Sequence, residues 1–330
     1  MRFAFTEDQL AFRDTVRDFL TAECPPSFVR SQATARDDGW RALWSKLAEM
    51  GVVGLTAAES SGGLGLGPLD LVLILEETGR AAMPGPVVET TSVALPVLQG
   101  GSLVERAAAG DAVIAVALDG GHDVAFGADA DALLVRDGDR LGLVDARSLR
   151  AVDVESVDGL RRLADVEWDT DAVTEIGGAD ALAAVRDRGA SAAAAQLCGV
   201  AARLLDFAVE YAKERHQFGV PIGSFQAVKH HCANAALKLE YARPVVYRAA
   251  YSLHHGDRDR SVHASMAKAY ASDAARLASR VALQVHGAIG YTAEHDLQLW
   301  MKRAWSLSVA WGDAAAHRAM VADAVLGARS

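Results

Sequence analysis

The sequence predicts a mainly helical protein with a small β domain, because the pattern of its apolar residues changes twice along the chain. Residues 1–110 and 178–330 carry apolar side chains at helical spacing, whereas residues 111–177 hold short runs of β-branched residues. A chain of 330 residues is long enough for two or three domains. We therefore expect an N-terminal α-helical domain, a short middle β domain and a C-terminal four-helix bundle.

The composition argues against several classes of partner. The formal net charge of −10 disfavours nucleic-acid binding, which normally uses a basic face. No apolar run approaches the ~20 residues of a membrane span, and the N-terminus lacks the long apolar segment of a signal peptide. Cys24, Cys198 and Cys232 form no C-x-x-C pair, which favours a reduced, cytoplasmic setting. Cys/His ligand spacings are absent as well, so we expect no metal.

Local signals place the first helices. Thr6 with Gln9 fits a capping box at the start of one helix, and the Pro25-Pro26 pair ends it. Apolar residues at helical spacing across 40–47 predict another helix, for which Gly51 is the expected C-cap.

The glycine-rich stretch 60–68 is predicted to be a structural loop. No strand precedes it, so a Rossmann interpretation fails its context test. Pro68 can begin the following helix at its first position.

The middle region reads as a small β domain. Residues 111–118 form a β-branched run, and residues 132–144 form two apolar runs around Asp137-Gly138-Asp139, which predicts a hairpin. Residues 166–176 alternate roughly with period two and predict a further strand.

The C-terminal region carries the apolar rows of a helix bundle. Rows at 197–211 and 262–285 and the tail from about Trp305 predict three helices. A fourth has alternating spacings of three and four, typical of a long helix in a bundle. Its row consists of Phe225, Val228, Cys232, Ala235, Leu239, Ala242, Val246, Ala249 and Leu253.

The stretch "RHQFG" at 215–219 separates two predicted helices and holds groups suited to a dinucleotide. Arg215 offers planar donors for a phosphate, Gln217 can hold a heterocycle edge, Phe218 can pack on a ring, and Gly219 allows close backbone approach. We expect Ser224 to cap the next helix through its first turn. A plain turn, with Arg215 as a C-terminal helix charge, explains the same residues.

The stretch "QVHGAIGYT" at 284–292 is a second candidate. A long helix is predicted to end at His286, where Gly287 and Gly290 break it. Exposed amides at such a helix end can receive a phosphate or sugar, and a simple C-cap is the other interpretation.

Five segments, in order, resemble the acyl-CoA dehydrogenase family over nearly the whole chain. "YAKERHQFGVPIGSFQAVKHHCAN" is the most specific. "QVHGAIGYTAEHDLQLWMKRA" matches the signature Q-x-x-G-G-x-G-Y, with Ala288 in place of the second glycine. The five are residues 5–20, 47–81, 126–135, 211–234 and 284–304.

The resemblance implies FAD-dependent removal of hydrogens from Cα and Cβ of an acyl-CoA, as in β-oxidation of lipids, with an electron-transfer flavoprotein as acceptor. A carboxylate takes the α-proton while a hydride passes to the flavin. Subunits of the family pair through their bundles. The resemblance also implies that the arginine, amide and phenylalanine of the first turn reach the ADP half of FAD bound mainly to a neighbouring subunit. By motif position, the FAD-contacting residues here are Arg215, Gln217, Phe218, Gln226, Gln284, Gly287 and Ala288.

The chain departs from the family at the catalytic base. The usual glutamate position falls on Trp311, and a second family location falls near Gly189, so neither holds a carboxylate. Asp313 and Asp187 each lie two residues from these positions and are weak candidates for the base.

The middle β domain is also short. Residues 116–131 run almost directly into a later segment, without the T-E-P-x-x-G-S-D-like stretch that contacts the flavin in the family. This combination resembles the shorter subunits of heterotetrameric acyl-CoA dehydrogenases of actinobacteria, including those acting on steroid side chains, in which a longer partner supplies the base. We expect such a subunit in an α2β2 assembly. The alternatives are a self-sufficient homo-oligomeric enzyme that uses Asp313 or Asp187, and a non-catalytic scaffold.

Overall fold

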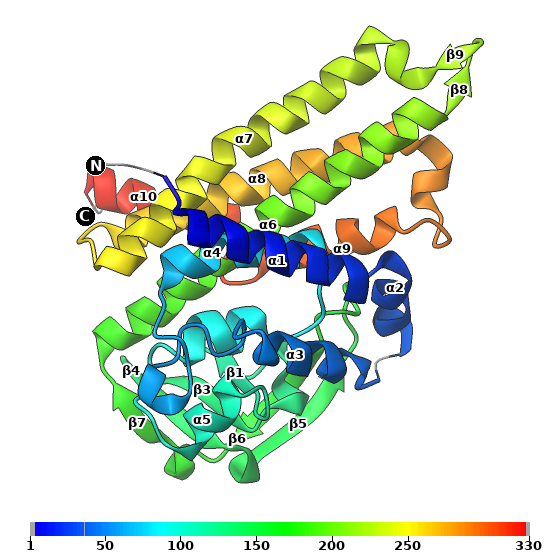
Figure 1. The fold of residues 1–330 in the computed structure, drawn as a ribbon. Helices are drawn as coiled ribbons and strands as arrows, with labels where there is room; N and C mark the ends of the chain where they lie inside the picture. Colours follow the sequence, from blue (N-terminus) through cyan, green and yellow to red (C-terminus); the bar gives the residue numbers. More distant parts are fainter. Residues whose placement is uncertain (1–3, 36, 328–330) are drawn as a thin grey trace. The chain divides into compact units, whose positions relative to one another are not determined.

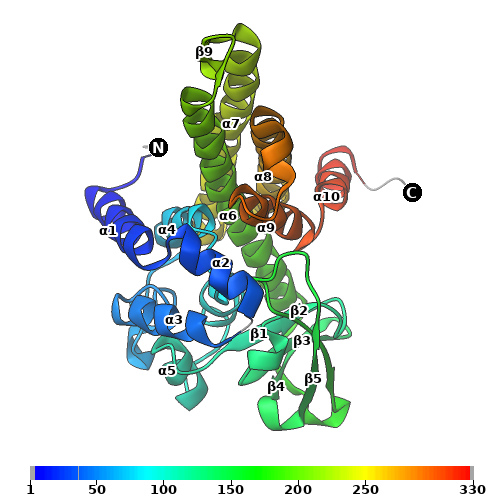
Figure 2. The same cartoon turned by 90° about the vertical axis from the view of Figure 1, so that its right-hand side faces the viewer.

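The computed structural model describes residues 4–35 and 37–327, and its elements are drawn in Figures 1 and 2. The chain divides into two compact units, which we call the helical unit and the mixed unit. The helical unit comprises Met1–Arg30, Val72–Met83 and Ala193–Ser330, and the mixed unit comprises Ser31–Leu71 and Pro84–Ala192. The chain is mainly helical with a small amount of sheet, as the sequence predicts.

The helical unit contains long antiparallel helices with shorter ones beside them (Figure 1). The capping box at Thr6 is confirmed, since the Thr6 hydroxyl accepts from the Gln9 amide and the Gln9 side chain accepts from the Thr6 amide. Helix α4 begins at Pro68, as predicted. The helices wholly in this unit are α1 (Glu7–Glu23), α7 (Gln226–His255), α8 (Arg260–His286), α9 (Leu297–Val309) and α10 (Ala314–Leu326). It also holds α4 (Pro68–Arg80) from Val72 and α6 (Ala179–Glu214) from Ala193.

The apolar row predicted for the long bundle helix is confirmed in α7. Its positions from Ala235 to Ala249 are buried, whereas Phe225 at its start is exposed. Helices α7 and α8 run side by side for most of their length (Figure 1). The many buried alanines of α8 allow this close approach because they leave little side chain between the backbones.

Two glycines bring α4 and α6 into backbone contact. A Cβ atom at Gly79 would lie 2.1 Å from the carbonyl oxygen of Gln196, and one at Gly199 would lie 1.8 Å from that of Glu76. Helix α6 starts well before the predicted row and is long and apolar enough to cross a membrane by length and composition alone. However, 78% of its apolar window is buried inside the protein, as in the core helix of a globular fold.

Two local predictions are wrong. The last bundle helix does not start near Trp305: α9 already begins at Leu297, and the chain breaks before α10 because Trp311 and Gly312 adopt left-handed backbone angles. Ser224 does not cap α7 either. Its hydroxyl donates to the Pro221 carbonyl, and the N-cap residue Phe225 has no side-chain cap.

The mixed unit combines short helices with two small sheets. One sheet has the order β1-β3-β4-β7 and the other β2-β6-β5. The predicted hairpin is confirmed, since β3 and β4 pair antiparallel around the Asp137–Arg140 turn. The predicted strand at 166–176 is instead two strands, β6 and β7, which belong to different sheets. The strands are β1 (Ile114–Ala117), β2 (Val124–Ala125), β3 (Ala132–Asp137), β4 (Arg140–Asp145), β5 (Leu149–Val154), β6 (Leu163–Trp168) and β7 (Thr174–Gly177).

Apolar side chains from both sheets, among them Leu133, Val144 and Val166, form one core cluster. The unit also contains α3 (Gly39–Glu49), α5 (Ser102–Ala108), the part of α2 (Pro26–Ala35) from Ser31, and a fully buried π-helix at Val87–Ala94. Of these elements, only α3 follows from the sequence pattern, and Gly51 directly follows its C-cap residue.

Candidate functional site

The first predicted site is a tight hairpin between α6 and α7. Strands β8 (His216–Gln217) and β9 (Val220–Pro221) pair antiparallel, and Phe218 and Gly219 form the loop between them (Figure 1). Both loop residues have positive φ angles, 53° and 81°, as a type I′ turn requires. The sequence "HQFGVP" therefore folds into a hydrogen-bonded hairpin rather than an irregular connection.

Phe218 occupies an unfavourable backbone conformation and is 92% exposed. A non-glycine residue in this region costs on the order of 1–3 kcal/mol. Its ring meets the edge of the Phe225 ring, with the ring centroids 6.2 Å apart. Strained residues of this kind cluster at ligand-binding sites, so the tip is suited to packing against a group outside this chain.

Arg215 is fixed by its backbone and has a free side chain. Its amide donates to the Tyr211 carbonyl at 2.9 Å, and its carbonyl accepts from the Ile222 amide at 2.8 Å. The exposed guanidinium forms no ion pair or hydrogen bond with any residue that the structure describes, so its planar donors are available to an anion. Gln217 and Gln226 are likewise exposed.

The second predicted site is the end of α8. The helix ends at His286 as predicted, because Gly287 has φ 59° and its amide closes the last turn on the Leu283 carbonyl. A short 3-10 helix, Gly287–Tyr291, follows. Gln284, Gly287 and Ala288 are all exposed at this helix end.

The structure brings both turns to the same end of the helical unit. The ring of Tyr211, one turn before the hairpin, stacks on the ring of His286 with centroids 4.4 Å apart. His286 is buried and its Nδ1–H donates to the Ala282 carbonyl at 2.8 Å. Burial lowers the pKa of His286, so the imidazole is neutral at neutral pH and serves as a packing surface between the two helix ends.

Trp311, at the expected base position, lies in the break between α9 and α10 with φ 60°. The fully buried Lys268 donates to the carbonyls of Ser308 at 2.9 Å and Gly312 at 2.7 Å. The Nε2–H of His317 donates to the Trp311 carbonyl at 2.8 Å. The turn is therefore held from both sides, and it presents an indole where a proton acceptor is expected.

The two candidate aspartates lie in different surroundings. Asp313 accepts hydrogen bonds from the amides of Ala316 and Ala315 and caps α10. These bonds, the Ala316 amide first, lower the pKa of Asp313, which makes the carboxylate a weaker proton acceptor. Asp187 lies on α6 within the mixed unit, two residues before the buried Gly189, and is itself buried. This geometry favours a structural role for Asp313 and leaves the base unassigned.

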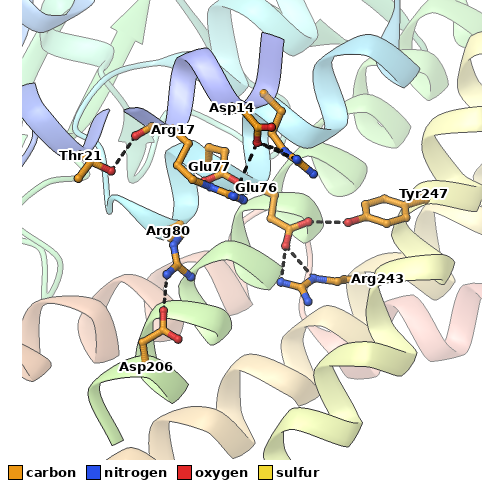
Figure 3. A network of polar contacts seen from close by, with 10 residues as sticks. Asp14, Arg17, Thr21, Glu76, Glu77, Arg80, Asp206, Arg243 and Tyr247 are labelled. Atoms are coloured by element: carbon orange, nitrogen blue, oxygen red, sulfur yellow. Dashed lines mark hydrogen bonds and ion pairs between the residues drawn. The ribbon is translucent and has the colours of Figure 1, made fainter. Parts of the chain in front are cut away.

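A buried ionic network around α4 was not anticipated from the sequence (Figure 3). The carboxylate of Glu76 accepts from Arg243 at 2.8 Å and from the Tyr247 hydroxyl at 2.8 Å. The adjacent Glu77 binds Arg17 through both carboxylate oxygens, at 2.5 and 2.9 Å. Burial, together with the Glu76 carboxylate, raises the pKa of Tyr247 far above its usual range. The sequence feature that points to this network is the pair of adjacent glutamates in the mostly apolar helix α4.

No group of three or more His, Cys, Asp or Glu side chains that could hold a metal occurs within residues 4–35 and 37–327. The cysteines at 24, 198 and 232 are free thiols.

Comparison with known families establishes the class of the protein. Family models named "Acyl-CoA dehydrogenase, N-terminal domain" and "Acyl-CoA dehydrogenase, C-terminal domain" match residues 6–117 and 178–326. The chain belongs to the acyl-CoA dehydrogenase family. The family consists of oxidoreductases, and its cofactor is FAD, which accepts the hydride taken from the acyl-CoA.

Two mycobacterial acyl-CoA dehydrogenases are similar to this chain over most of its length. Acyl-CoA dehydrogenase IpdE2 of Mycolicibacterium smegmatis is 35% identical over 302 residues, covering 91% of this chain and 93% of the relative. FadE34 of Mycobacterium tuberculosis is 36% identical over 333 residues, and this chain spans only 45% of that longer protein.

Solved structures share the fold. The ChsE4-ChsE5 complex from Mycobacterium tuberculosis contains a chain with a TM-score of 0.91 and 24% identity, with both chains fully covered. The Tcur3481-Tcur3483 steroid acyl-CoA dehydrogenase variant has a TM-score of 0.85 and 26% identity, covering 97% of this chain and 98% of the other.

The residues present fit one end of FAD better than the other. Arg215 with an unoccupied guanidinium and Phe218 on a strained, exposed tip suit the phosphates and a ring of the ADP half. At the base position, Trp311 has no group that accepts a proton.

Proposed function

We propose that this chain is the β-like subunit of an α2β2 acyl-CoA dehydrogenase and lends ADP-side contacts to FAD lodged mostly in its partner. One observation carries the proposal. Arg215 and Phe218 are exposed at the hairpin, whereas the turn at Trp311 offers no base. A chain that has exposed cofactor-contacting residues but lacks a catalytic base is suited to completing another subunit's cofactor site.

In this assembly the longer partner supplies the carboxylate that takes the α-proton of the acyl-CoA. Arg215 binds the pyrophosphate of FAD, Phe218 packs on a ring of the ADP half, and the amides near Gly287 provide a second contact. The likeness to chains of the ChsE4-ChsE5 complex and of the Tcur3481-Tcur3483 steroid enzyme supports a two-subunit enzyme acting on a bulky acyl group.

The proposal includes an electron-transfer flavoprotein as the acceptor and a cytoplasmic location. Similarity to a chain from a structure of the electron-transferring flavoprotein of Acidaminococcus fermentans supports the first, with 26% identity and a TM-score of 0.84. The free cysteines support the second.

The surface of the helical unit supports assembly with another subunit. Large apolar side chains are exposed on several of its helices, where isolated monomers usually expose only scattered ones. They include Leu237 and Tyr241 on α7, Tyr270 on α8, and Trp305 and Val309 on α9.

The test is co-expression with a longer homologous subunit that has an intact glutamate. We expect stoichiometric FAD and acyl-CoA turnover in the complex, and neither in this chain alone. Arg215→Ala should weaken FAD binding by roughly 10- to 100-fold, because charge-assisted hydrogen bonds to phosphate are lost. Arg258→Ala is the matched control, since this exposed arginine lies in the loop between α7 and α8. FAD-loaded, active protein from this chain alone would overturn the proposal.

Two alternatives give different results in the same assays. A self-sufficient enzyme would turn over as a homo-oligomer and would lose activity in Asp313→Ala or Asp187→Ala. A scaffold subunit would assemble with the partner, but Arg215→Ala would leave the FAD content of the complex unchanged.

A further inference from the structure

A cavity of about 230 Å³ lies within the helical unit, among α1, α4, α6 and α9. None of its lining residues belongs to the two turns or to the break at Trp311. Its lining includes three arginines but only one carboxylate. The charged residues are Arg17, Arg80, Arg203 and Glu77.

Arg17 and Arg80 are held by ion pairs that use only some of their N–H donors. Arg17 uses its Nε and one terminal nitrogen on Glu77, and its other terminal nitrogen lies 3.8 Å from a carboxylate oxygen of Asp14. Arg80 uses one terminal nitrogen on Asp206 (Figure 3). A guanidinium carries five N–H donors, so each arginine keeps donors beyond those that Glu77, Asp14 and Asp206 take. The ion pairs fix the positions of the two groups at the cavity and leave part of each planar fork available.

The third arginine is the least neutralised. The guanidinium of Arg203 lies over the ring of Phe207 at 4.1 Å and near that of Trp300 at 6.0 Å. Among residues 4–35 and 37–327, its one carboxylate contact is to Glu210 at 3.5 Å, the outer limit of a hydrogen bond. Stacking holds the guanidinium plane and leaves its N–H edge free to donate.

The rest of the wall is apolar and does not repel a negative charge. Trp300 is fixed because its Nε1–H donates to the Arg80 carbonyl at 2.8 Å. Cys24 is buried, and burial raises the pKa of its thiol to about 12, so the sulfur stays uncharged at neutral pH.

We propose that this cavity binds a small oxyanion, either phosphate or the carboxylate of a short organic acid. Three arginines that line one space suit such groups, since the arginine fork matches the oxygens of both. The volume lies below the roughly 300–1,000 Å³ of pockets for larger organic ligands, which disfavours a nucleotide. The site is independent of the FAD proposal because it shares no residue with either turn.

The experiment is calorimetric titration of the full-length chain with phosphate or with succinate, each in chloride buffer of constant ionic strength. We expect saturable binding of at least one anion to one site per chain, and the anion that saturates identifies the ligand class. Arg203→Lys, which keeps the charge but loses the planar fork, should weaken binding roughly 10-fold or more.

A second variant protects the test against misfolding. Thr21 lies on the exposed side of α1 and lines the cavity, so Thr21→Trp should fill the space while leaving all three arginines in place. It should abolish binding, and Arg258→Ala should leave it unchanged. No saturable binding of either anion, or equal affinity in the native chain, Arg203→Lys and Thr21→Trp, would overturn the proposal.

Discussion

Replacing Glu76 with glutamine tests whether the network on α4 stabilises the helical unit. The side chain of Glu76 is 10% exposed and that of Arg243 is 27% exposed, and the pair joins α4 to α7. Glutamine keeps the size of the side chain and can still accept a hydrogen bond from Tyr247. It removes the charge that balances a largely buried guanidinium.

The expected magnitude follows from that burial. Removing one partner of a buried ion pair costs about 3–5 kcal/mol, because the other charge is left uncompensated. Arg243 is partly exposed and retains Glu240 as a second partner, which reduces the loss. We expect Glu76→Gln to lower the free energy of unfolding by about 2–3 kcal/mol.

The assay is urea unfolding followed by far-UV circular dichroism, arranged as a double-mutant cycle. Arg243→Met and the double variant complete the cycle, and the double variant should recover part of the lost stability since no unpaired charge remains. Asp145→Asn is the control, because the Asp145 carboxylate forms an exposed local pair with the Arg147 side chain and accepts from the Arg147 amide, a bond that asparagine can keep. Additive single effects, or a loss in Glu76→Gln no larger than in Asp145→Asn, would contradict a stabilising buried pair.

Three further variants test other features. Gly199→Ala should lower the thermal midpoint, because its Cβ would lie 1.8 Å from the backbone of α4, whereas Gly178→Ala, which meets no atom within 4 Å, should not. Burial lowers the pKa of His317, so the unfolded chain binds the proton more readily, and stability is lost as the pH falls below the ordinary value of 6.5. His317→Gln should reduce this acid sensitivity in a pH series of thermal melts, while the same change at the exposed His122 should not. Phe218→Gly should leave the stability unchanged or raised, since it relieves a positive φ, and should reduce FAD retention by the complex; unchanged retention would exclude a ring contact.

Features that depend on neighbours in the chain could be predicted from the sequence. The capping box at Thr6, the β3–β4 hairpin and the apolar row of α7 all follow from local spacing, and the structure contains each of them. The π-helix at Val87–Ala94 escaped prediction because its β-branched, polar run has no helical period. The break at Trp311 escaped because tryptophan rarely adopts a left-handed conformation, and tertiary hydrogen bonds hold it there.

The site was predictable only in part. The family resemblance located the turn at Arg215. The type I′ geometry of the turn and the exposure of the guanidinium could be seen only in the structure. The pair between Glu76 and Arg243 joins residues 167 positions apart, and no local pattern reports such a contact. The cavity at Arg203 likewise depends on how four helices meet.

The hydrogen-bonded turn at Trp311 affects how easily such a chain can gain or lose a catalytic carboxylate. Lys268 and His317 donate hydrogen bonds to backbone carbonyls of the turn, so the Trp311 indole contributes none of these bonds. A side chain at this position can therefore be exchanged without rebuilding the loop around it. In an assembly whose other subunit already holds the acid–base group, a carboxylate here is dispensable, and Trp311→Glu would return one to the same spot on an intact scaffold.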